Sequence, residues 1–215
     1  MQIQAVIFDL GRVLLDFDHA IAARKISAFS RKSPEEIYRL FFDSRLIQAF
    51  EAGKISPEDF FAEVKRMLSL SVGFGEFLPI WNEIFFLTDQ NRQVYNLARR
   101  LRGRYRVALL SNVNCLHFEY VQKTFPIFDV FDFLLLSYEL GHVKPDPQIY
   151  RRSLSIIGTK PEETFYVDDR PELIAQAQKL GLRAFVYQGI DQLKADLASC
   201  GIRSRRRGLS RKFLP

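Results

Sequence analysis

Short, almost wholly apolar runs recur along the chain. The first, residues 3–10 (IQAVIFDL), ends in a charge and is followed by Gly11. A run of this length and composition is typical of a strand that is buried on both faces of a parallel sheet. We expect four more strands, at residues 106–110, 133–136, 164–167 and 183–187.

Segments with helical periodicity lie between most of these strands. Thr88 suits the N-cap of a helix whose apolar residues share one face and which Gly103 stops. Further helices are expected at 115–124, 147–157 and 172–180. The alternation of strands and helices predicts an α/β fold, a doubly wound parallel sheet with helices on both faces.

Residues 16–88 break this alternation, because their pattern predicts helices only. One helix is expected at 20–29, and two others begin with the prolines that follow Ser33 and Ser56. The economical interpretation is a small α-helical cap inserted after the first strand. The predicted parts are the α/β core at 1–15 and 89–201, the helical cap at 16–88, and a basic C-terminal tail at 202–215.

Composition indicates a folded protein with a neutral body. The chain has 215 residues, 47% of them hydrophobic, which is enough to bury a core. Its net charge of +6 comes from 31 basic and 25 acidic residues, but six of the basic ones lie in the tail. A neutral body does not favour a nucleic-acid surface, and we interpret the tail as a solvated terminus.

The N-terminus and the cysteines bear on the compartment. The first ten residues lack the basic region of a signal peptide, and no apolar run approaches the ~18 residues of a membrane span. Cys115 and Cys200 form neither a disulfide framework nor a zinc spacing. We expect a cytoplasmic protein without a membrane span. Whether it is a monomer or a dimer is left open.

Polar side chains stand near the ends of the predicted strands, where ligands bind in open α/β sheets. They are Asp9 after the first strand, Ser111 and Asn112 after the second, Lys144 in the loop after the third, and Asp168 and Asp169 after the fourth. Carboxylates supply hard oxygen ligands for Mg²⁺, and a carboxylate can itself attack phosphorus. A lysine, a hydroxyl and a cation neutralise and orient a phosphoryl group. Each residue alone has a structural explanation, but their recurrence along the sheet favours a phosphoryl-transfer site.

Four segments carry these residues, in the order FDLGRV, LLSNVN, KPDPQIY and YVDDRPE. They resemble the four motifs of the haloacid dehalogenase (HAD) superfamily, and FEAGKISPEDF (50–60) resembles the small helical cap of its subfamily I. The DLG form of the first motif is similar to that of the bacterial α-glucose-1-phosphatase type. The resemblance implies a Rossmann-like core and a Mg²⁺-dependent hydrolase.

The same resemblance implies a role for each site residue. Asp9 corresponds to the nucleophile, Lys144 to a catalytic phosphate-binding residue, and Ser111 and Asn112 to further phosphate binders. The implied metal ligands are Asp9, the backbone carbonyl of Gly11, Asp169 and, with less weight, Asp168, which could instead hold Lys144 in place.

Gly11 departs from the family pattern, which has a second aspartate there as the acid–base group. Its absence predicts an enzyme that binds Mg²⁺ but is slow with poor leaving groups, since general acid catalysis contributes about 10²–10⁴-fold. A glycine here also allows a positive φ. Asp16, Asp18 and His19 follow closely enough to replace the acid, although Asp18 is more simply a helix N-cap. We interpret His19 and His142 as structural.

The function that best fits is a phosphatase acting on a small phosphorylated metabolite, with sugar phosphates among the candidates. Two alternatives stay open. One is a 2-haloacid dehalogenase-type hydrolase, whose branch also lacks the second aspartate, and the other is a catalytically weak protein that binds a phosphorylated ligand. The sequence does not specify the substrate. The cap residues that we expect to face the site are Arg45, Phe50, Glu51 and Lys54.

Overall fold

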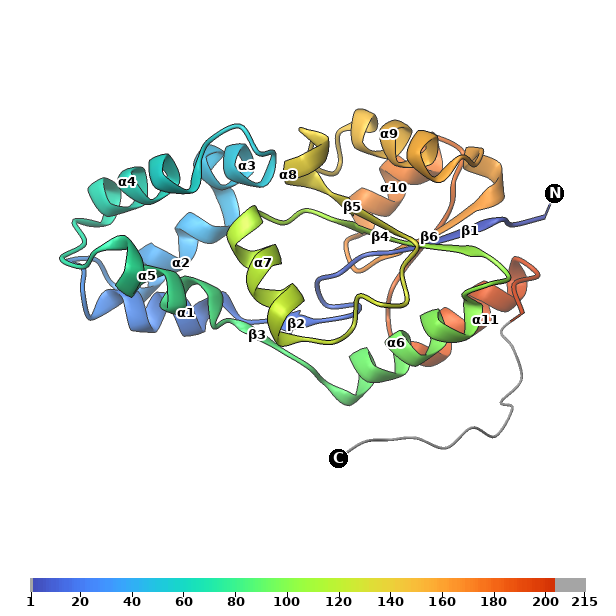
Figure 1. The fold of residues 1–215 in the computed structure, drawn as a ribbon, viewed down its shortest axis with the longest axis horizontal. Helices are drawn as coiled ribbons and strands as arrows, with labels where there is room; N and C mark the ends of the chain where they lie inside the picture. Colours follow the sequence, from blue (N-terminus) through green and yellow to red (C-terminus); the bar gives the residue numbers. More distant parts are fainter. Residues whose placement is uncertain (1, 204–215) are drawn as a thin grey trace.

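Five parallel strands form the central sheet of the computed structural model, which describes residues 2–203 (Figure 1). The strands are β1 (Ala5–Phe8), β4 (Arg106–Ser111), β5 (Phe133–Leu136), β6 (Thr164–Asp168) and β7 (Arg183–Val186). Their spatial order is β5-β4-β1-β6-β7, so β1 is central and pairs with β4 on one side and with β6 on the other. All five predicted strands are confirmed, with ends within two residues of those expected.

Helices cover both faces of the sheet, because successive strand residues point to opposite faces. On one face Val6 and Phe8 pack with α6 and α11, and on the other Ala5 and Ile7 pack with α9 and α10 (Figure 1). The bounds of these helices are α6 (Asp89–Leu101), α9 (Pro147–Ile157), α10 (Pro171–Lys179) and α11 (Ile190–Ser199). The doubly wound α/β fold is therefore confirmed.

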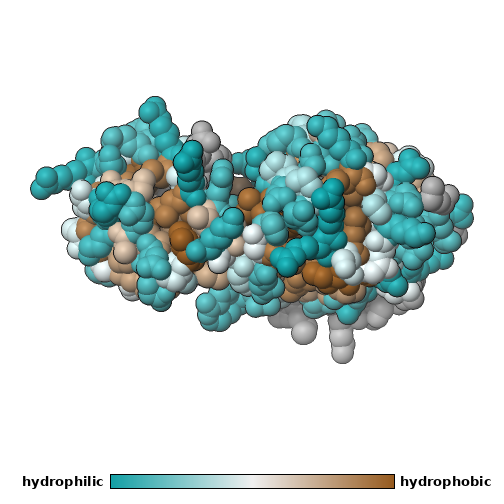
Figure 2. Space-filling model, turned by 90° about the horizontal axis from the view of Figure 1, so that it is seen from above, coloured by the Kyte–Doolittle hydropathy of each residue, from teal (hydrophilic) through white to brown (hydrophobic). Residues whose placement is uncertain are grey.

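A lobe of helices follows the first strand, as predicted, and Figure 2 shows it separated from the core lobe by a constriction. Its helices are α1 (His19–Ser27), α2 (Pro34–Asp43), α3 (Arg45–Glu51), α4 (Pro57–Leu68) and α5 (Phe74–Asn82). Asp18 caps α1, since its Oδ1 accepts the N–H of Ala20 at 2.8 Å, which confirms that interpretation. Ser33 and Glu36 form a capping box at the start of α2, and Pro34 is its first residue, as predicted.

The prediction of helices only was wrong at both ends of this insert. β2 (Asp16–Phe17) and β3 (Phe85–Phe86) form a two-stranded antiparallel ladder, in which Phe17 lies opposite Phe85. Strands of two residues carry no periodic signal, so the sequence pattern could not reveal them. The ladder joins the chain segment that leads into the cap to the segment that leaves it (Figure 1).

The cap has an apolar core of its own, built largely from aromatic rings. Phe50 stacks on Phe60 with ring centroids 4.2 Å apart, and Phe60 contacts Trp81 at 5.0 Å. Trp81 stacks in turn on His117 at 4.7 Å. His117 belongs to α7 (Cys115–Thr124), a helix of the core, so this column of rings joins the two lobes.

His117 is held between the lobes as a neutral imidazole. Its Nε2 lies 3.1 Å from the Trp81 carbonyl oxygen, and its Nδ1 lies 3.1 Å from the Asn114 amide nitrogen. Asn114 is fixed in this orientation because its Oδ1 accepts the His117 backbone N–H at 2.9 Å. A single proton on Nε2 satisfies both contacts. Burial lowers the pKa of His117 to about 3, which agrees with a neutral ring.

The last residues that the structure describes pack against the core. Ile202 is 5% exposed and belongs to the apolar cluster around α6 and α11, while the Arg203 backbone N–H donates to the Tyr105 hydroxyl at 3.0 Å. We expected the tail to begin at residue 202, but these contacts extend the packed body through residue 203. The rest of the predicted tail, 204–215, lies outside the described residues. Across residues 2–203, no helix combines the length and the apolar composition that crossing a membrane requires.

Candidate active site

The polar residues predicted at strand ends converge at the carboxyl ends of the central strands. Asp9 follows β1 directly, and its backbone N–H donates to the Val167 carbonyl oxygen of β6 at 3.0 Å. Ser111 and Asp168 are the last residues of β4 and β6, the two neighbours of β1. Ser111 is 3% exposed, and its hydroxyl forms no hydrogen bond with the residues that the structure describes, so it is available to a ligand.

Lys144 joins two of these carboxylates. Its Nζ donates to Asp9 Oδ1 and Asp168 Oδ2, both at 2.6 Å, and to the Leu110 carbonyl oxygen at 3.1 Å. All three N–H bonds of the ammonium group are thereby used. Burial alone would lower the pKa of Lys144, but the charges of Asp168 and Asp9 outweigh it and raise that pKa above its ordinary value. The lysine is therefore a buried cation, with its side chain 2% exposed.

Asp168 has both carboxylate oxygens engaged. Oδ2 accepts Lys144 Nζ and the Tyr166 hydroxyl, and Oδ1 accepts the Arg170 backbone N–H at 3.0 Å. Burial acts to raise the pKa of Asp168, but the Lys144 charge and these hydrogen bonds hold it below its ordinary value. Asp9 differs, because burial raises its pKa to about 7 against the opposing charge of Lys144, and its Oδ2 has no partner within the described part of the chain.

Tyr166, which sequence reasoning did not single out, belongs to this cluster. It is fully buried, its hydroxyl bonds Asp168, and its ring centroid lies 5.8 Å from Lys144 Nζ. Tyr166 and Asp168 are two residues apart in β6 and so share a face of the sheet. This spacing of two residues from Asp168 is the sequence signal from which Tyr166 could have been predicted as a member of the site.

Asn112 fixes the backbone of Lys144 from the loop after β4. Its Oδ1 accepts the Lys144 N–H at 2.7 Å, and its Nδ2 donates to the Lys144 carbonyl oxygen at 3.0 Å. Both ends of the amide that we expected on a phosphate are thus bonded to the lysine backbone. The pair of hydrogen bonds sets the point from which the Lys144 side chain extends.

Asp169 completes a cluster of three carboxylates. Ligand oxygens of Asp9, Asp168 and Asp169 all lie within 4.8 Å of one another. Asp169 is the least buried of the three, and its Oδ2 lies 4.0 Å from Nε of Arg12. Partial burial and the charge of Asp168 raise the pKa of Asp169. Three carboxylates with hard oxygen donors fit Mg²⁺ well, and Asp9 and Asp169 have the less occupied oxygens.

Gly11 lies in the loop after β1, and its φ is not in the left-handed region. The positive φ of this loop falls one residue later, on Arg12, at 58°. A Cβ atom on Gly11 would lie 2.8 Å from Cε1 of Phe17, which is closer than van der Waals contact permits. The loop's backbone hydrogen bonds go to the carbonyls of Leu10 and Leu15, which leaves the Gly11 carbonyl oxygen without a backbone donor among residues 2–203.

The residues considered as substitutes for the missing acid have other surroundings. Asp18 is occupied as the N-cap of α1. The His19 ring lies 4.9 Å from the Phe17 ring, and burial lowers the pKa of His19 to about 4, so it is uncharged at neutral pH. His142 Nδ1 lies 2.7 Å from Oδ2 of Asp146, the N-cap residue of α9. Asp16 is placed in the β2–β3 ladder.

The four cap residues predicted to face the site have different environments. Phe50 is 1% exposed and lies in the apolar core of the cap, while Arg45 and Lys54 are exposed. Glu51, the last residue of α3, is half-buried and lies close enough to Lys144 for the lysine charge to act on its carboxyl. Glu51 is therefore the member of this group near the strand ends.

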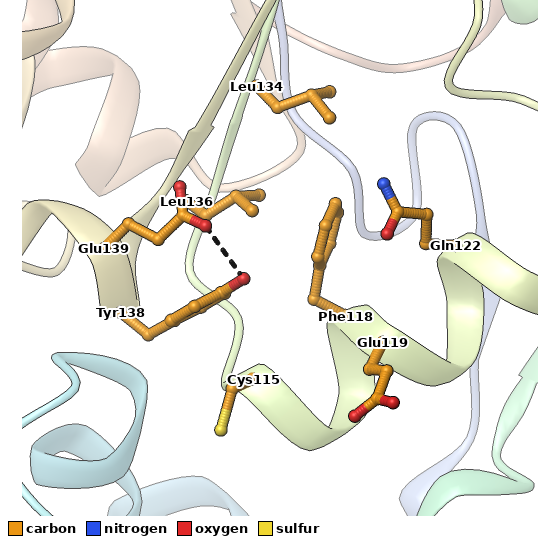
Figure 3. Close-up of a pocket in the computed structure, with 8 residues that line it drawn as sticks. All are labelled: Cys115, Phe118, Glu119, Gln122, Leu134, Leu136, Tyr138 and Glu139. Atoms are coloured by element: carbon orange, nitrogen blue, oxygen red, sulfur yellow. Dashed lines mark hydrogen bonds between the residues drawn. The ribbon is translucent and has the colours of Figure 1, made fainter.

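A separate cavity of about 420 Å³ lies between α7, β5 and α8 (Ser137–Leu140), as Figure 3 shows. Cys115 is half-buried at its edge. The lining residues are Cys115, Phe118, Glu119, Gln122, Leu134, Leu136, Tyr138 and Glu139. None of the predicted site residues is among them, so this cavity is distinct from the strand-end cluster.

Sequence comparison relates the chain to known hydrolases. Residues 6–187 match a family model described as haloacid dehalogenase-like hydrolase. The D-ribitol-5-phosphate phosphatase of Bacteroides thetaiotaomicron is 29% identical over 189 residues, which cover 85% of this chain and 91% of that protein.

Solved structures share the fold. A HAD family enzyme of Bacteroides thetaiotaomicron, in complex with magnesium and inorganic phosphate, has a TM-score of 0.75 at 28% identity and covers 86% of this chain and 94% of its own. A predicted HAD-like family hydrolase from Porphyromonas gingivalis has a TM-score of 0.76 at 26% identity, with coverage of 93% and 98%.

Proposed function

The chain belongs to the haloacid dehalogenase-like hydrolase family, and from this membership we propose that it is a Mg²⁺-dependent phosphatase of a small phosphorylated metabolite. Asp9 attacks phosphorus and forms an aspartyl-phosphate, which water then hydrolyses. The observation that carries the proposal is the buried pairing of Lys144 with Asp9 and Asp168, at 2.6 Å each, with Asp169 beside them.

We assign each side chain a task from its contacts. Asp9 is the nucleophile, because Lys144 holds one of its oxygens and leaves Oδ2 to approach phosphorus. The Ser111 hydroxyl holds a phosphoryl oxygen, and the positive charge of Lys144, next to Asp9, stabilises the charge that develops on the phosphoryl group. Asp168 and Asn112 position Lys144, the first through its ammonium group and the second through its backbone.

Mg²⁺ would be held by Asp9, Asp169 and the Gly11 carbonyl oxygen. All three donors are hard oxygens, as this ion requires, and each has lone pairs that no described backbone or side-chain donor uses in full. When bound, the ion would neutralise part of the charge of the carboxylates and of an incoming phosphate, which otherwise repel one another.

We propose a sugar or polyol phosphate as the substrate class, in line with the relative named a D-ribitol-5-phosphate phosphatase. A metal-free dehalogenase would have little use for the acidic pair Asp168 and Asp169. A protein that only binds a phosphorylated ligand would not need a nucleophile bonded to Lys144. The compartment that we propose is the cytoplasm, where thiols such as those of Cys115 and Cys200 stay reduced.

A panel of sugar, polyol and nucleotide phosphates, assayed for phosphate release with and without Mg²⁺, tests the proposal. The parent protein should turn over at least one ester only when Mg²⁺ is present. Asp9→Asn should abolish turnover, and protein quenched in acid during turnover should carry covalent phosphate that this variant lacks.

The matched control is Asp191→Asn, an exposed carboxylate of α11 that pairs with Lys194. It should leave turnover unchanged. Hydrolysis that persists in Asp9→Asn, or that proceeds fully without a divalent ion, would contradict the proposed function.

A further inference from the structure

Glu51 is fixed where the cap meets the core. The Ser137 hydroxyl donates to the Glu51 carbonyl oxygen at 2.6 Å and accepts the backbone N–H of Val113, in the loop after β4, at 3.0 Å. Two residues further on, Gly53 has a φ of +65°, and a Cβ atom there would lie 2.2 Å from the Tyr138 carbonyl oxygen. This approach requires glycine. It holds α3 beside α8 (Figure 1) and Glu51 close to the loops that carry the site.

The Glu51 carboxyl lies near two cations and is bonded to neither. It forms no hydrogen bond or ion pair with the residues that the structure describes, although the charges of Arg170 and Lys144 act on it. Among the described side chains of α2, α4 and α8, the helices that pack against α3, no acid or base adds to the effect of these two charges on the pKa of Glu51. Burial raises the pKa of Glu51 to about 7, and the two cations offset only part of that effect. A carboxyl with such a pKa carries a proton in a large fraction of molecules at neutral pH.

The reaction geometry places the leaving group on the cap side of the crevice. Asp9 stands at the end of β1, so it approaches phosphorus from the sheet, at about 3–3.5 Å in a reactive arrangement. In phosphoryl transfer the leaving oxygen lies roughly in line with the attacking oxygen, on the far side of phosphorus. The leaving oxygen therefore faces the cap. On the core side, Gly11 has no side chain, and the Phe17 ring fills the space that one would take.

Building on the proposed phosphatase function, we propose that Glu51 is the general acid that protonates the leaving oxygen. In the first step an Asp9 carboxylate oxygen bonds to phosphorus and the bond from phosphorus to the ester oxygen breaks. The electron pair of that bond takes the proton of the Glu51 carboxyl, and the alcohol leaves. In the second step water bonds to phosphorus and gives a proton to the Glu51 carboxylate, while the Asp9 carboxylate departs from phosphorus. One water is consumed, and both carboxyl groups return to their starting forms.

Two esters of similar size but different leaving groups test this role. p-Nitrophenolate leaves without a proton, whereas the alkoxide of benzyl phosphate needs one. In Glu51→Gln the kcat for benzyl phosphate should fall by about 10²-fold or more, and the kcat for p-nitrophenyl phosphate by less than about threefold. The parent should also lose benzyl phosphate turnover as the pH rises through about 7, and Glu51→Gln should lack this limb of the profile.

Two further variants serve as a negative control and as a conservative replacement. Glu58→Gln removes an exposed glutamate of α4, a cap helix, and should change neither substrate. Glu51→Asp keeps a carboxyl on a shorter side chain, so it should retain the pH limb with part of the rate. It also serves as the test variant if circular dichroism shows that Glu51→Gln does not fold.

Equal losses on the two esters would overturn the assignment, because Glu51 would then act in binding or folding alone. Unchanged turnover of benzyl phosphate in Glu51→Gln would overturn it as well. Failure of the proposed function has a different signature, since the parent itself would not hydrolyse p-nitrophenyl phosphate in Mg²⁺.

Discussion

The ring of Phe17 occupies the space into which a side chain on Gly11 would project, with 2.8 Å between Phe17 Cε1 and the position of a Cβ atom on Gly11. The ring is held there by neighbours, because the Arg12 guanidinium lies 5.2 Å and the His19 ring 4.9 Å from its centroid. Phe17 belongs to β2, the strand that leads into the cap. The ring that takes the place of an acidic side chain at position 11 therefore belongs to the β2–β3 ladder that connects the two lobes.

Gly11→Asp should destabilise the protein without improving hydrolysis of benzyl phosphate. The new side chain collides with the Phe17 ring, and overpacking of this kind costs about 1–3 kcal/mol. Thermal unfolding should show a lower Tm, and Gly11→Asp/Phe17→Leu should recover part of it. Phe17→Leu alone is the control for the lost ring contacts. A Gly11→Asp protein as stable as the parent would show that the ring moves aside at little cost.

Lys144→Met should abolish turnover and lower stability. Asp9 and Asp168 lose their shared cation, and breaking a buried ion pair from one side costs about 3–5 kcal/mol. Urea unfolding in the absence of Mg²⁺ measures the loss. Lys144→Met/Asp168→Asn should recover part of the stability, because one uncompensated carboxylate is removed, but none of the activity. Equal stability of the single and double variants would show that Asp168 is not the main partner of the lysine.

Stability should fall as the pH drops below about 6.5, with His117 as one cause. Its pKa is about 3 in the folded protein and 6.5 when unperturbed, so the unfolded chain takes up the proton first. Protonation of the unfolded state then favours unfolding, by about 2 kcal/mol per such group between pH 7.5 and pH 5. His117→Gln keeps a donor for the Trp81 carbonyl oxygen but does not titrate. Its free energy of unfolding, measured against pH, should have a shallower slope, and an unchanged slope would contradict the neutral ring.

Deletion of residues 204–215 should leave Tm and turnover unchanged, whereas deletion of 202–215 should lower Tm. The longer deletion removes Ile202 from the apolar cluster, a loss of about 1.5–3 kcal/mol for a buried aliphatic side chain. It also removes the Arg203 contact with the Tyr105 hydroxyl. Calorimetry of the two truncated proteins checks the difference. Equal Tm values would show that Ile202 contributes nothing.

The strand-end residues were predictable because one rule of topology applies to all of them. Parallel strands deliver their carboxyl ends to one edge of a sheet, so Asp9, Ser111 and Asp168 had to meet once the strands were recognised. Lys144 was expected in the same place, and its bonds to two carboxylates agree with that. The cap was predictable for a similar reason, since a long helical stretch interrupts a regular alternation of strands and helices.

The features that escaped prediction depend on contacts between distant segments. His117 contacts Trp81 across the two lobes, and Phe17, in the β2–β3 ladder, packs against Gly11. No local pattern of residues in the sequence predicts either contact. Asn112 illustrates a different difficulty. Its position near a strand end is evident from the sequence, but its partner, the Lys144 backbone, follows only from the path of the loop.

The β2–β3 ladder also shortens the path by which the sheet can assemble. Ala5 of β1 pairs with Arg106 of β4, about a hundred positions along the chain, and pairing over such a separation is slow. Once the cap helices have packed and β2 has met β3, the loop that β1 and β4 must close shrinks to roughly thirty residues. Loop-closure entropy grows with the logarithm of length, so this lowers the cost by about 1 kcal/mol. A cap that folds early therefore brings β1 and β4, the two strands that carry Asp9 and Ser111 at their ends, closer together before they pair.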